Sequence, residues 1–290
     1  MRRVGYFPGC AVEGVASEYG ASLRAVAEAI GVELVEPEGW SCCGSISARA
    51  VGGRLAGSLA RRNLDAAARG PSPLVTPCSG CYQNLATEAR RAGGPAPEVV
   101  HALDFFASDE IVESVLAAVG DRTPLPFPYK VVCYYGCLMT KPRQIAADDP
   151  DRPVKMDRLM ERMGLDVRDW SARTSCCGSG AGLWDPDGTV RLVAAILDDA
   201  RAAGAEYIIT ACPMCQLNLD ARQYEASGEL EAEAHFPVLY FTEVLAYALA
   251  LPVMEKLRKR HLMSDEEIVR RYELEGGAAS ARSSSTRRVT

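Results

Sequence analysis

The sequence SCCGS occurs twice in this chain, at residues 41–45 and again at residues 175–179. Further cysteines flank both copies in the same order. The first half reads C-x31-CCG-x33-CxxC from Cys10 to Cys81, and the second reads C-x38-CCG-x33-CxxC from Cys137 to Cys215. Because five cysteines recur in register, we interpret the chain as an internal duplication in which each half builds one similar unit.

The overall composition is typical of a folded protein with two domains. The chain has 290 residues, of which 48% are hydrophobic and 24% are charged, and this is enough apolar material for two cores. The formal net charge is −6. Because an acidic chain provides no broad basic field, we do not expect nucleic acid to be a partner.

The sequence also argues against membrane insertion and export. The most apolar stretch, residues 236–254, contains Pro237, Glu243 and Pro252, which interrupt the ~20 apolar residues that a membrane-spanning helix needs. The first ten residues, MRRVGYFPGC, include no apolar segment of a secretory signal. We therefore expect a cytoplasmic protein with no transmembrane segment. Eleven cysteines in such a protein favour metal or redox chemistry, because cytosolic thiols are kept reduced.

Short apolar runs alternate with helical patterns in both halves. We predict strands at residues 3–7, 32–35, 74–76, 99–103, 131–135, 166–169, 207–210 and 238–241. Alternating strands and helices indicate parallel sheets. The predicted fold is therefore α/β, with two pseudo-symmetric Rossmann-like βα repeats, each containing a small parallel sheet flanked by helices.

Three helical patterns place apolar residues on one face, which we expect to cover a sheet. The residues at helical spacing are Leu23, Val26 and Ile30; Val51, Leu55 and Leu59; and Val190, Val193 and Leu197.

A proline-rich stretch, DRTPLPFPYK at residues 121–130, separates the halves. Its three prolines break both helices and inner strands. We therefore place a first domain at residues 1–122 and a second at residues 129–250. A charged, helix-compatible extension follows at residues 251–275, and residues 276–290 lack the apolar side chains that would order them.

The cysteines follow the predicted strands, where ligands of parallel sheets usually bind. Five thiols of each half should therefore converge on one pocket. A CxxC at the start of a helix places both sulfurs on one turn, and Pro213 suits such a first turn. Adjacent cysteines can share a site only if the backbone bends, which Gly44 and Gly178 permit.

Five thiols exceed the four ligands of a zinc ion or of a cubane iron–sulfur cluster. The fifth is either a spare thiol beside a site with four ligands or a ligand of a larger, more open cluster. Zinc in one site is thus an alternative to iron.

The two five-cysteine blocks resemble the two CCG domains of the B subunit of heterodisulfide reductase, over residues 3–250. This resemblance implies two noncubane [4Fe-4S] clusters that together reduce or form a disulfide of small thiols. The residues implied as cluster ligands and as the catalytic centre are Cys10, Cys42, Cys43, Cys78, Cys81, Cys137, Cys176, Cys177, Cys212 and Cys215.

The same resemblance implies partners, since no flavin or nicotinamide fingerprint occurs in the sequence. They would be similar to the other heterodisulfide reductase subunits, namely a cubane iron–sulfur protein and a flavoprotein. CCG domains also occur in proteins associated with succinate, glycerol-phosphate and lactate dehydrogenation. The alternative function is therefore an iron–sulfur electron-transfer or anchoring subunit of such a complex.

The loop after Cys137 carries basic side chains that could bind an anionic disulfide substrate. They are Lys141, Arg143, Arg152 and Lys155, and we name Lys141 and Arg143 as candidates for substrate binding. Three aspartates lie among them, so an ordinary solvated loop of mixed charge is the alternative.

One further cysteine and three histidines are expected to have structural or surface positions and not to bind a metal. Cys133 lies inside a predicted strand, where a small buried thiol packs well. His101 is expected to pack or form a hydrogen bond at a strand end. His235 and His261 are not spaced with the thiols, and we expect both at the surface.

Overall fold

The first half alternates strands and helices, as its periodicity predicts. The computed structural model describes residues 1–93, 96–120, 129–146, 148–229 and 235–270. The strands of the first half are β1 (Arg2–Tyr6), β2 (Val32–Val35), β3 (Leu74–Thr76) and β4 (Val99–His101). Its helices are α1 (Cys10–Glu13), α2 (Ser17–Ala29), α3 (Ser47–Val51), α4 (Gly53–Ala67), α5 (Ser79–Arg91), α6 (Ala102–Phe106) and α7 (Asp109–Val119).

The second half repeats this order. Its strands are β5 (Lys130–Tyr134), β6 (Asp166–Val167), β7 (Tyr207–Thr210) and β8 (Val238–Tyr240). Its α-helices are α8 (Lys155–Arg162), α9 (Pro186–Ala202), α10 (Pro213–Ala221), α11 (Gln223–Ser227), α12 (Phe241–Ala248) and α13 (Met254–Leu257). Short 3₁₀ turns include η2 (Arg143–Ile145), η3 (Ala172–Thr174) and η4 (Arg258–Arg260).

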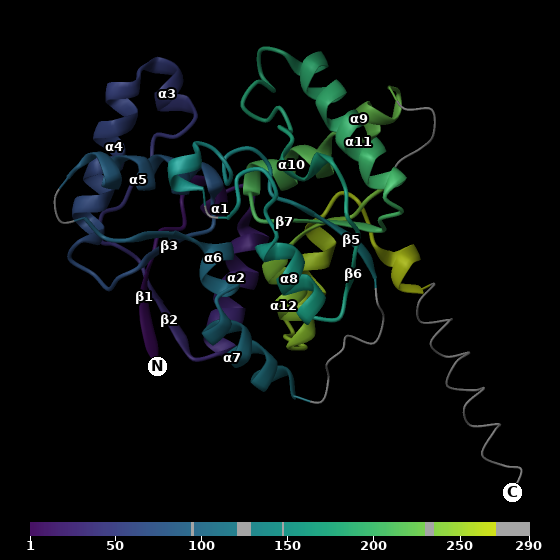
Figure 1. The fold of residues 1–290 in the computed structure, drawn as a ribbon, viewed down its shortest axis with the longest axis horizontal. Coiled ribbons are helices and arrows are strands. Elements are labelled where there is room, and N and C mark those ends of the chain that lie inside the picture. The colour runs from purple at the N-terminus through teal and green to yellow at the C-terminus, as the bar shows by residue number, and fades with distance from the viewer. Residues whose placement is uncertain (94–95, 121–128, 147, 230–234, 271–290) are drawn as a thin grey trace, which may run out of the picture.

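The two sheets have the same topology. Their strand orders are β2-β1-β3-β4 and β6-β5-β7-β8, and every pairing is parallel. The α/β prediction with two similar repeats is confirmed. Five strands end earlier than predicted: β1, β5 and β8 by one residue, and β4 and β6 by two. β4 stops at His101 because this residue caps α6. Figure 1 shows the two halves side by side, with helices between them.

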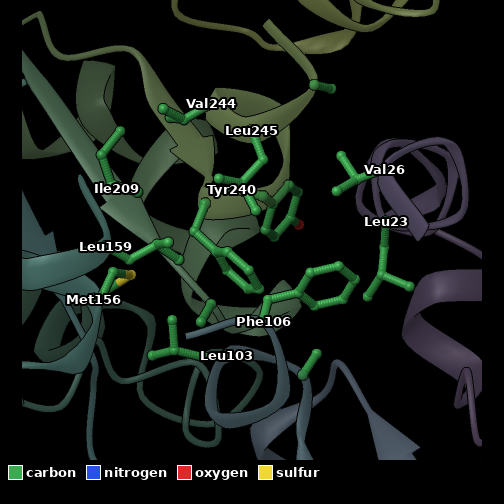
Figure 2. Close-up of a cluster of buried hydrophobic side chains, with 14 of the residues drawn as sticks. Leu23, Val26, Leu103, Phe106, Met156, Leu159, Ile209, Tyr240, Val244 and Leu245 are labelled. Carbon is green, nitrogen blue, oxygen red and sulfur yellow. The ribbon is translucent and has the colours of Figure 1, made fainter. Parts of the chain in front are cut away.

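A shared core of helices joins the halves. Helix α2 packs against α12, and α6 packs against α8, so each half contributes one partner to each pair. The rings of Tyr19 and Tyr240 stack with centroids 4.1 Å apart, and the ring of Phe106 lies near that of Phe241. Figure 2 shows side chains of both halves converging in this core, among them Leu23, Phe106 and Tyr240. Each fully buried large apolar side chain contributes ~1.5–3 kcal/mol, so this core fixes the placement of the two sheets.

One predicted apolar face is wrong. Val51 is 80% exposed and Leu55 is 45% exposed. The reason is that α3 ends at Val51 and α4 begins only at Gly53, so the apolar spacing does not continue along one helix. Helix α4 instead buries small residues, including Ala56 and Ala60. The other two faces are confirmed, because their central residues are buried in the core.

The prediction of a surface position for His261 is also wrong. Residues after α12 fold back over the second half, and the side chain of His261 is only 3% exposed. Its ring contacts Glu243 at 2.9 Å and Gln216 at 3.0 Å. The C-terminal extension is thus partly a docked segment. The predicted linker prolines and the predicted tail lie outside the described residues, and the domain boundaries at 122 and 129 remain predictions.

No helix in the described part of the chain is both long and apolar enough to span a bilayer.

Candidate functional site

Five thiols of the first half line one cavity. Cys10 begins α1, Cys42 and Cys43 lie in the loop after β2, Cys78 is the N-cap of α5, and Cys81 lies in its first turn. All five border a cavity of about 470 Å³. Because parallel strands end at one edge of the sheet, their following loops bring together thiols that are up to 71 residues apart.

The second half gathers its five thiols in the same way. Cys212 is the N-cap of α10, and Cys215 lies in its first turn after Pro213. The sulfur of Cys215 lies 3.6 Å from that of Cys177, and Cys137 forms a hydrogen bond with Cys176. The structure therefore brings together the predicted site residues of each half.

The two sets of thiols adjoin across the interface between the halves. Cys212 lines the same cavity as the five thiols of the first half. It also forms a hydrogen bond with the hydroxyl of Ser79, the residue after Cys78. Ser179, Leu183 and other second-half residues complete the wall. The cavity thus lies between the halves, with sulfurs from both at its surface.

Two glycines allow the backbone to approach the sulfurs closely. Gly9 has a φ of +75°, and a Cβ placed there would lie 2.8 Å from the sulfur of Cys81. Gly136 has a φ of +67°, and its Cβ would lie 3.0 Å from the sulfur of Cys215. Any other residue at these positions would displace a sulfur.

The predicted bends after the paired cysteines are present. Gly44 and Gly178 have φ values of +82° and +78°. The bend turns the amide of Gly44 toward the sulfur of Cys42 at 3.5 Å and that of Gly178 toward the sulfur of Cys176 at 3.4 Å. These amides are positioned to stabilise negative charge on sulfur.

Sequence reasoning missed two asparagines that hold the CCG loops. The side-chain amide of Asn84 donates to the carbonyl of Cys43 at 2.6 Å and to that of Ala56 at 3.1 Å. Asn218 donates to the carbonyl of Cys177 in the same way. The signal was available, since both halves read CxxCxxN and not only CxxC.

The thiols differ widely in acidity. Burial, and then the neighbouring Cys42, raise the pKa of Cys10 to about 11. A hydrogen bond from Cys137 lowers the pKa of Cys176 to about 6, assisted by the Gly178 amide and the charge of Lys141. A hydrogen bond from Cys215 likewise lowers the pKa of Cys212 to about 6. Neighbouring thiolates repel one another, so a cationic centre would favour their joint ionisation.

The donor set fits an iron–sulfur centre, which needs soft thiolate ligands. Each half presents five sulfurs, glycines leave room beside them, and the first set surrounds a cavity large enough for a polynuclear group. In the described part of the chain, no group of three or more Cys, His, Asp or Glu side chains lies close enough together to hold a metal ion.

The two candidate substrate-binding residues lie outside the cavity wall. Neither Lys141 nor Arg143 lines it. Arg143 pairs with Asp151, whereas the charge of Lys141 acts on Cys176. Both roles remain predictions. The other two basic residues of this loop also pair within the chain, Arg152 with Asp169 and Lys155 with Asp104.

Among the described residues, Arg222 is the one charged side chain that lines the cavity. Its guanidinium bonds to Asn218 at 2.9 Å and to Glu225 at 2.8 Å. Arg222 is the C-cap of α10, about two helical turns after Cys215. Sequence reasoning missed it because the pattern of cysteines carries no information about charge at this distance.

The predictions for Cys133 and His101 are confirmed. Cys133 is fully buried in the core shared by the halves. His101 is fully buried and caps α6 by accepting the amide hydrogen of Leu103 at 3.0 Å. Burial lowers the pKa of His101 to about 3. His235 is exposed, as expected, and contacts the carbonyl of Ser264.

A family model describes most of both halves. The cysteine-rich CCG domain matches residues 4–86 and again residues 131–220. The chain belongs to this family, with two copies of the domain, and each copy contains one complete set of five cysteines.

Several relatives are similar over nearly the full chain. The chain is 26% identical to the 8-methylmenaquinol:fumarate reductase membrane anchor subunit of Wolinella succinogenes, over 88% of this chain and 95% of that protein. It is also 26% identical to the B subunit of the ferredoxin:CoB-CoM heterodisulfide reductase of Methanosarcina mazei, over 96% of this chain and 99% of that protein. The resemblance indicated by the motifs is therefore confirmed.

A solved structure of a hypothetical protein from Helicobacter pylori shares the fold, with a TM-score of 0.69 at 11% identity. The similarity covers 91% of this chain and 52% of that chain.

Proposed function

We propose that this protein is the catalytic iron–sulfur subunit of a complex similar to heterodisulfide reductase. It reduces or forms a disulfide of small thiols at two noncubane [4Fe-4S] clusters. The observation that carries this proposal is the cavity between the halves, where Cys212 of the second half lies beside the five thiols of the first. The similarity to the B subunits of heterodisulfide reductases supports it.

In this proposal, each set of five cysteines holds one cluster. The clusters, when bound, would supply the two electrons that reductive cleavage of an S–S bond requires. The chain itself positions the ligands. Asn84 and Asn218 fix the CCG loops through the Cys43 and Cys177 carbonyls.

The remaining wall of the cavity would select and shield the substrate. Leu138, Met214 and Leu217 provide apolar surface that excludes water from the sulfurs. Arg222 provides one fixed positive charge, which suits a disulfide with a carboxylate, sulfonate or phosphate group. Lys141 and Arg143 lie on the loop that follows Cys137, where they can attract such an anion to the site.

This role requires external electron carriers. We propose a cubane iron–sulfur protein and a flavoprotein as partners, and the cytoplasm as the location. The similarity to subunits of multi-subunit redox enzymes supports such an assembly.

A second candidate is an electron-transfer or anchoring subunit. Leu183 is 95% exposed and Trp184 is 69% exposed, although both border the cavity. Such side chains are typical of a surface that binds another protein or a lipid interface. The relative named as a membrane anchor subunit supports this alternative.

Anaerobic purification followed by metal analysis and EPR distinguishes these functions. The proposal predicts about eight irons per chain, four for each cluster, and EPR signals that change when a small anionic disulfide is added. Cys43→Ala should halve the iron content, whereas the control Cys133→Ala should leave it unchanged. Full iron with no response to any disulfide would favour electron transfer alone, and zinc in place of iron would refute the cluster assignment.

A further inference from the structure

The two halves share a fold but carry opposite net charge over corresponding stretches of sequence. Residues 41–93 and 175–227 align without a gap, from one CCG motif to the helix after the CxxC. The first window carries seven arginines against one aspartate and one glutamate, a net of +5. The second carries three arginines against seven acids, a net of −4. The cationic surface is therefore local, in a chain whose total charge is −6.

Much of this positive charge has no ion-pair partner among the described residues. Arg54, Arg61 and Arg62 are exposed on α4, and none of them pairs with a carboxylate in that part of the chain. Elsewhere most of the described arginines do, for example Arg24 with Glu36 and Arg258 with Asp265. Solvated arginines that are left unpaired in one place are available to bind an anionic surface.

These arginines border an open groove of about 710 Å³ between α4 and α5. Gly57 forms part of it, and a Cβ there would lie 3.2 Å from the carboxyl carbon of Glu88. Glu88 pairs with Arg91 at 2.7 Å, and Asp65 also lines the groove. The acids are too few to balance the groove, which keeps a net positive charge.

Apolar side chains are exposed next to the groove. Val51 and Leu55 were predicted to face a sheet, but they face solvent on α3 and α4 beside Arg54. Arginines mixed with exposed aliphatic side chains are typical of a protein interface, where the apolar part provides buried area and the charges set orientation.

The opposite face of α4 contacts the first set of thiols. Ala60 and Leu64 pack in one cluster with Cys43, Cys78 and Cys81. The groove is thus separated from these sulfurs by one helix, which is ~10 Å thick. A redox centre held at the groove would lie close to the first cluster. It would lie far from α9 of the second half, which Figure 1 shows on the opposite side of the molecule.

We propose that the α3–α4 face is the docking surface for an acidic electron-carrier protein, which exchanges electrons with the first cluster. This inference rests on the proposed function for the need for electrons, but its test measures binding and not turnover. The corresponding helix α9 carries three aspartates against two arginines and provides no comparable cationic face, so electrons enter through one half.

The test uses an acidic bacterial ferredoxin as the probe and basic cytochrome c as the control protein, with the iron-loaded full chain. Ferredoxin should bind, and its affinity should fall as ionic strength rises from about 0.05 to about 0.5 M. The triple charge reversal Arg54→Glu, Arg61→Glu and Arg62→Glu should weaken this binding at least about tenfold, mostly through slower association.

Two matched variants complete the design. Arg191→Glu reverses an exposed arginine on α9 and should leave ferredoxin binding unchanged. The triple arginine-to-lysine variant should retain it. Circular dichroism and iron content confirm that each variant is folded and loaded.

Three results would overturn the docking proposal: no binding of ferredoxin, equal weakening by Arg191→Glu, or arginine-dependent binding to anionic phosphatidylglycerol vesicles in place of ferredoxin. Because binding and iron content are measured separately, loss of docking with full iron leaves the proposed function intact. Binding without iron would instead refute the proposed function alone.

Discussion

Replacing Gly9 with alanine tests whether the backbone beside the first thiols is shaped for a cluster. A Cβ at Gly9 would lie 2.8 Å from the sulfur of Cys81, about 1 Å inside the ordinary contact distance of ~3.5–4.0 Å. The sulfur must therefore move by ~1 Å, whereas functional groups must be held to within ~0.5 Å of their productive positions. We expect Gly9→Ala to lose the iron of the first site and retain that of the second.

Gly9→Ala also strains the backbone, so a control variant must separate this strain from the contact with the sulfur. Gly9 has φ +75° and ψ +158°, a region that costs other residues ~1–3 kcal/mol. Gly31 has a similar φ of +74°, but nothing lies within 4 Å of its Cβ position. Gly31→Ala should therefore destabilise the fold by ~1–2 kcal/mol and keep all of the iron.

The assay is urea unfolding of the anaerobic protein, with iron and acid-labile sulfide measured on the same sample. If Gly9→Ala and Gly31→Ala lose similar stability and both keep full iron, the close approach at Gly9 has no role in holding the site, and our interpretation of the glycine is wrong.

Three further predictions address the loop, the cavity and the docked extension. Asn84→Ala should cost ~1–3 kcal/mol, since it leaves the buried carbonyl of Cys43 unpaired, and should speed iron loss to a chelator; unchanged loss would contradict this. Arg222→Gln should raise the KM for an anionic disulfide but not for a neutral one; equal effects in a kinetic comparison would exclude charge recognition. Burial lowers the pKa of His261, but the hydrogen bond with Glu243 and the charges of Glu243, Asp220 and Glu18 together more than offset this and raise it above 6.5. The ion pair therefore stabilises the fold fully below pH 6.5 and progressively less as the pH rises through the folded-state pKa. The difference in unfolding free energy between wild type and His261→Gln, measured by urea unfolding, should shrink toward alkaline pH. A difference that grows with pH would contradict this.

The duplicated cysteine pattern helped to predict the fold because the cysteines mark where successive strands end. Thiols that recur after successive apolar runs require those strands to end at one edge, and the bounds of three strands were predicted to the residue. Two predictions failed, for different reasons. Gly52 separates two helices that the spacing of Val51 and Leu55 had joined, and His261 is buried only because the extension folds back onto Glu243.

The cavity between the halves could not be predicted from the cysteine spacing. Its position depends on how two similar units meet, and that is set by the packing of α2 on α12 and of α6 on α8. The aromatic residues of this interface, such as Tyr19 and Tyr240, carry no motif that distinguishes them from an ordinary core. The asparagine of CxxCxxN, in contrast, was visible in the sequence and follows the same duplication as the thiols.

The two halves have the same site residues but different charge. This difference separates the residues that would hold the clusters from those that would bind an electron carrier. All ten thiols match between the halves, and so do the pairs Gly9/Gly136, Gly44/Gly178 and Asn84/Asn218, as expected if both sites hold the same kind of centre. Net charge does not match, with +5 over residues 41–93 and −4 over residues 175–227. A pair of identical redox sites needs equal ligands but only one entrance for electrons. The halves can therefore diverge in charge without losing the reaction, and this divergence is what would direct a single carrier to the first half.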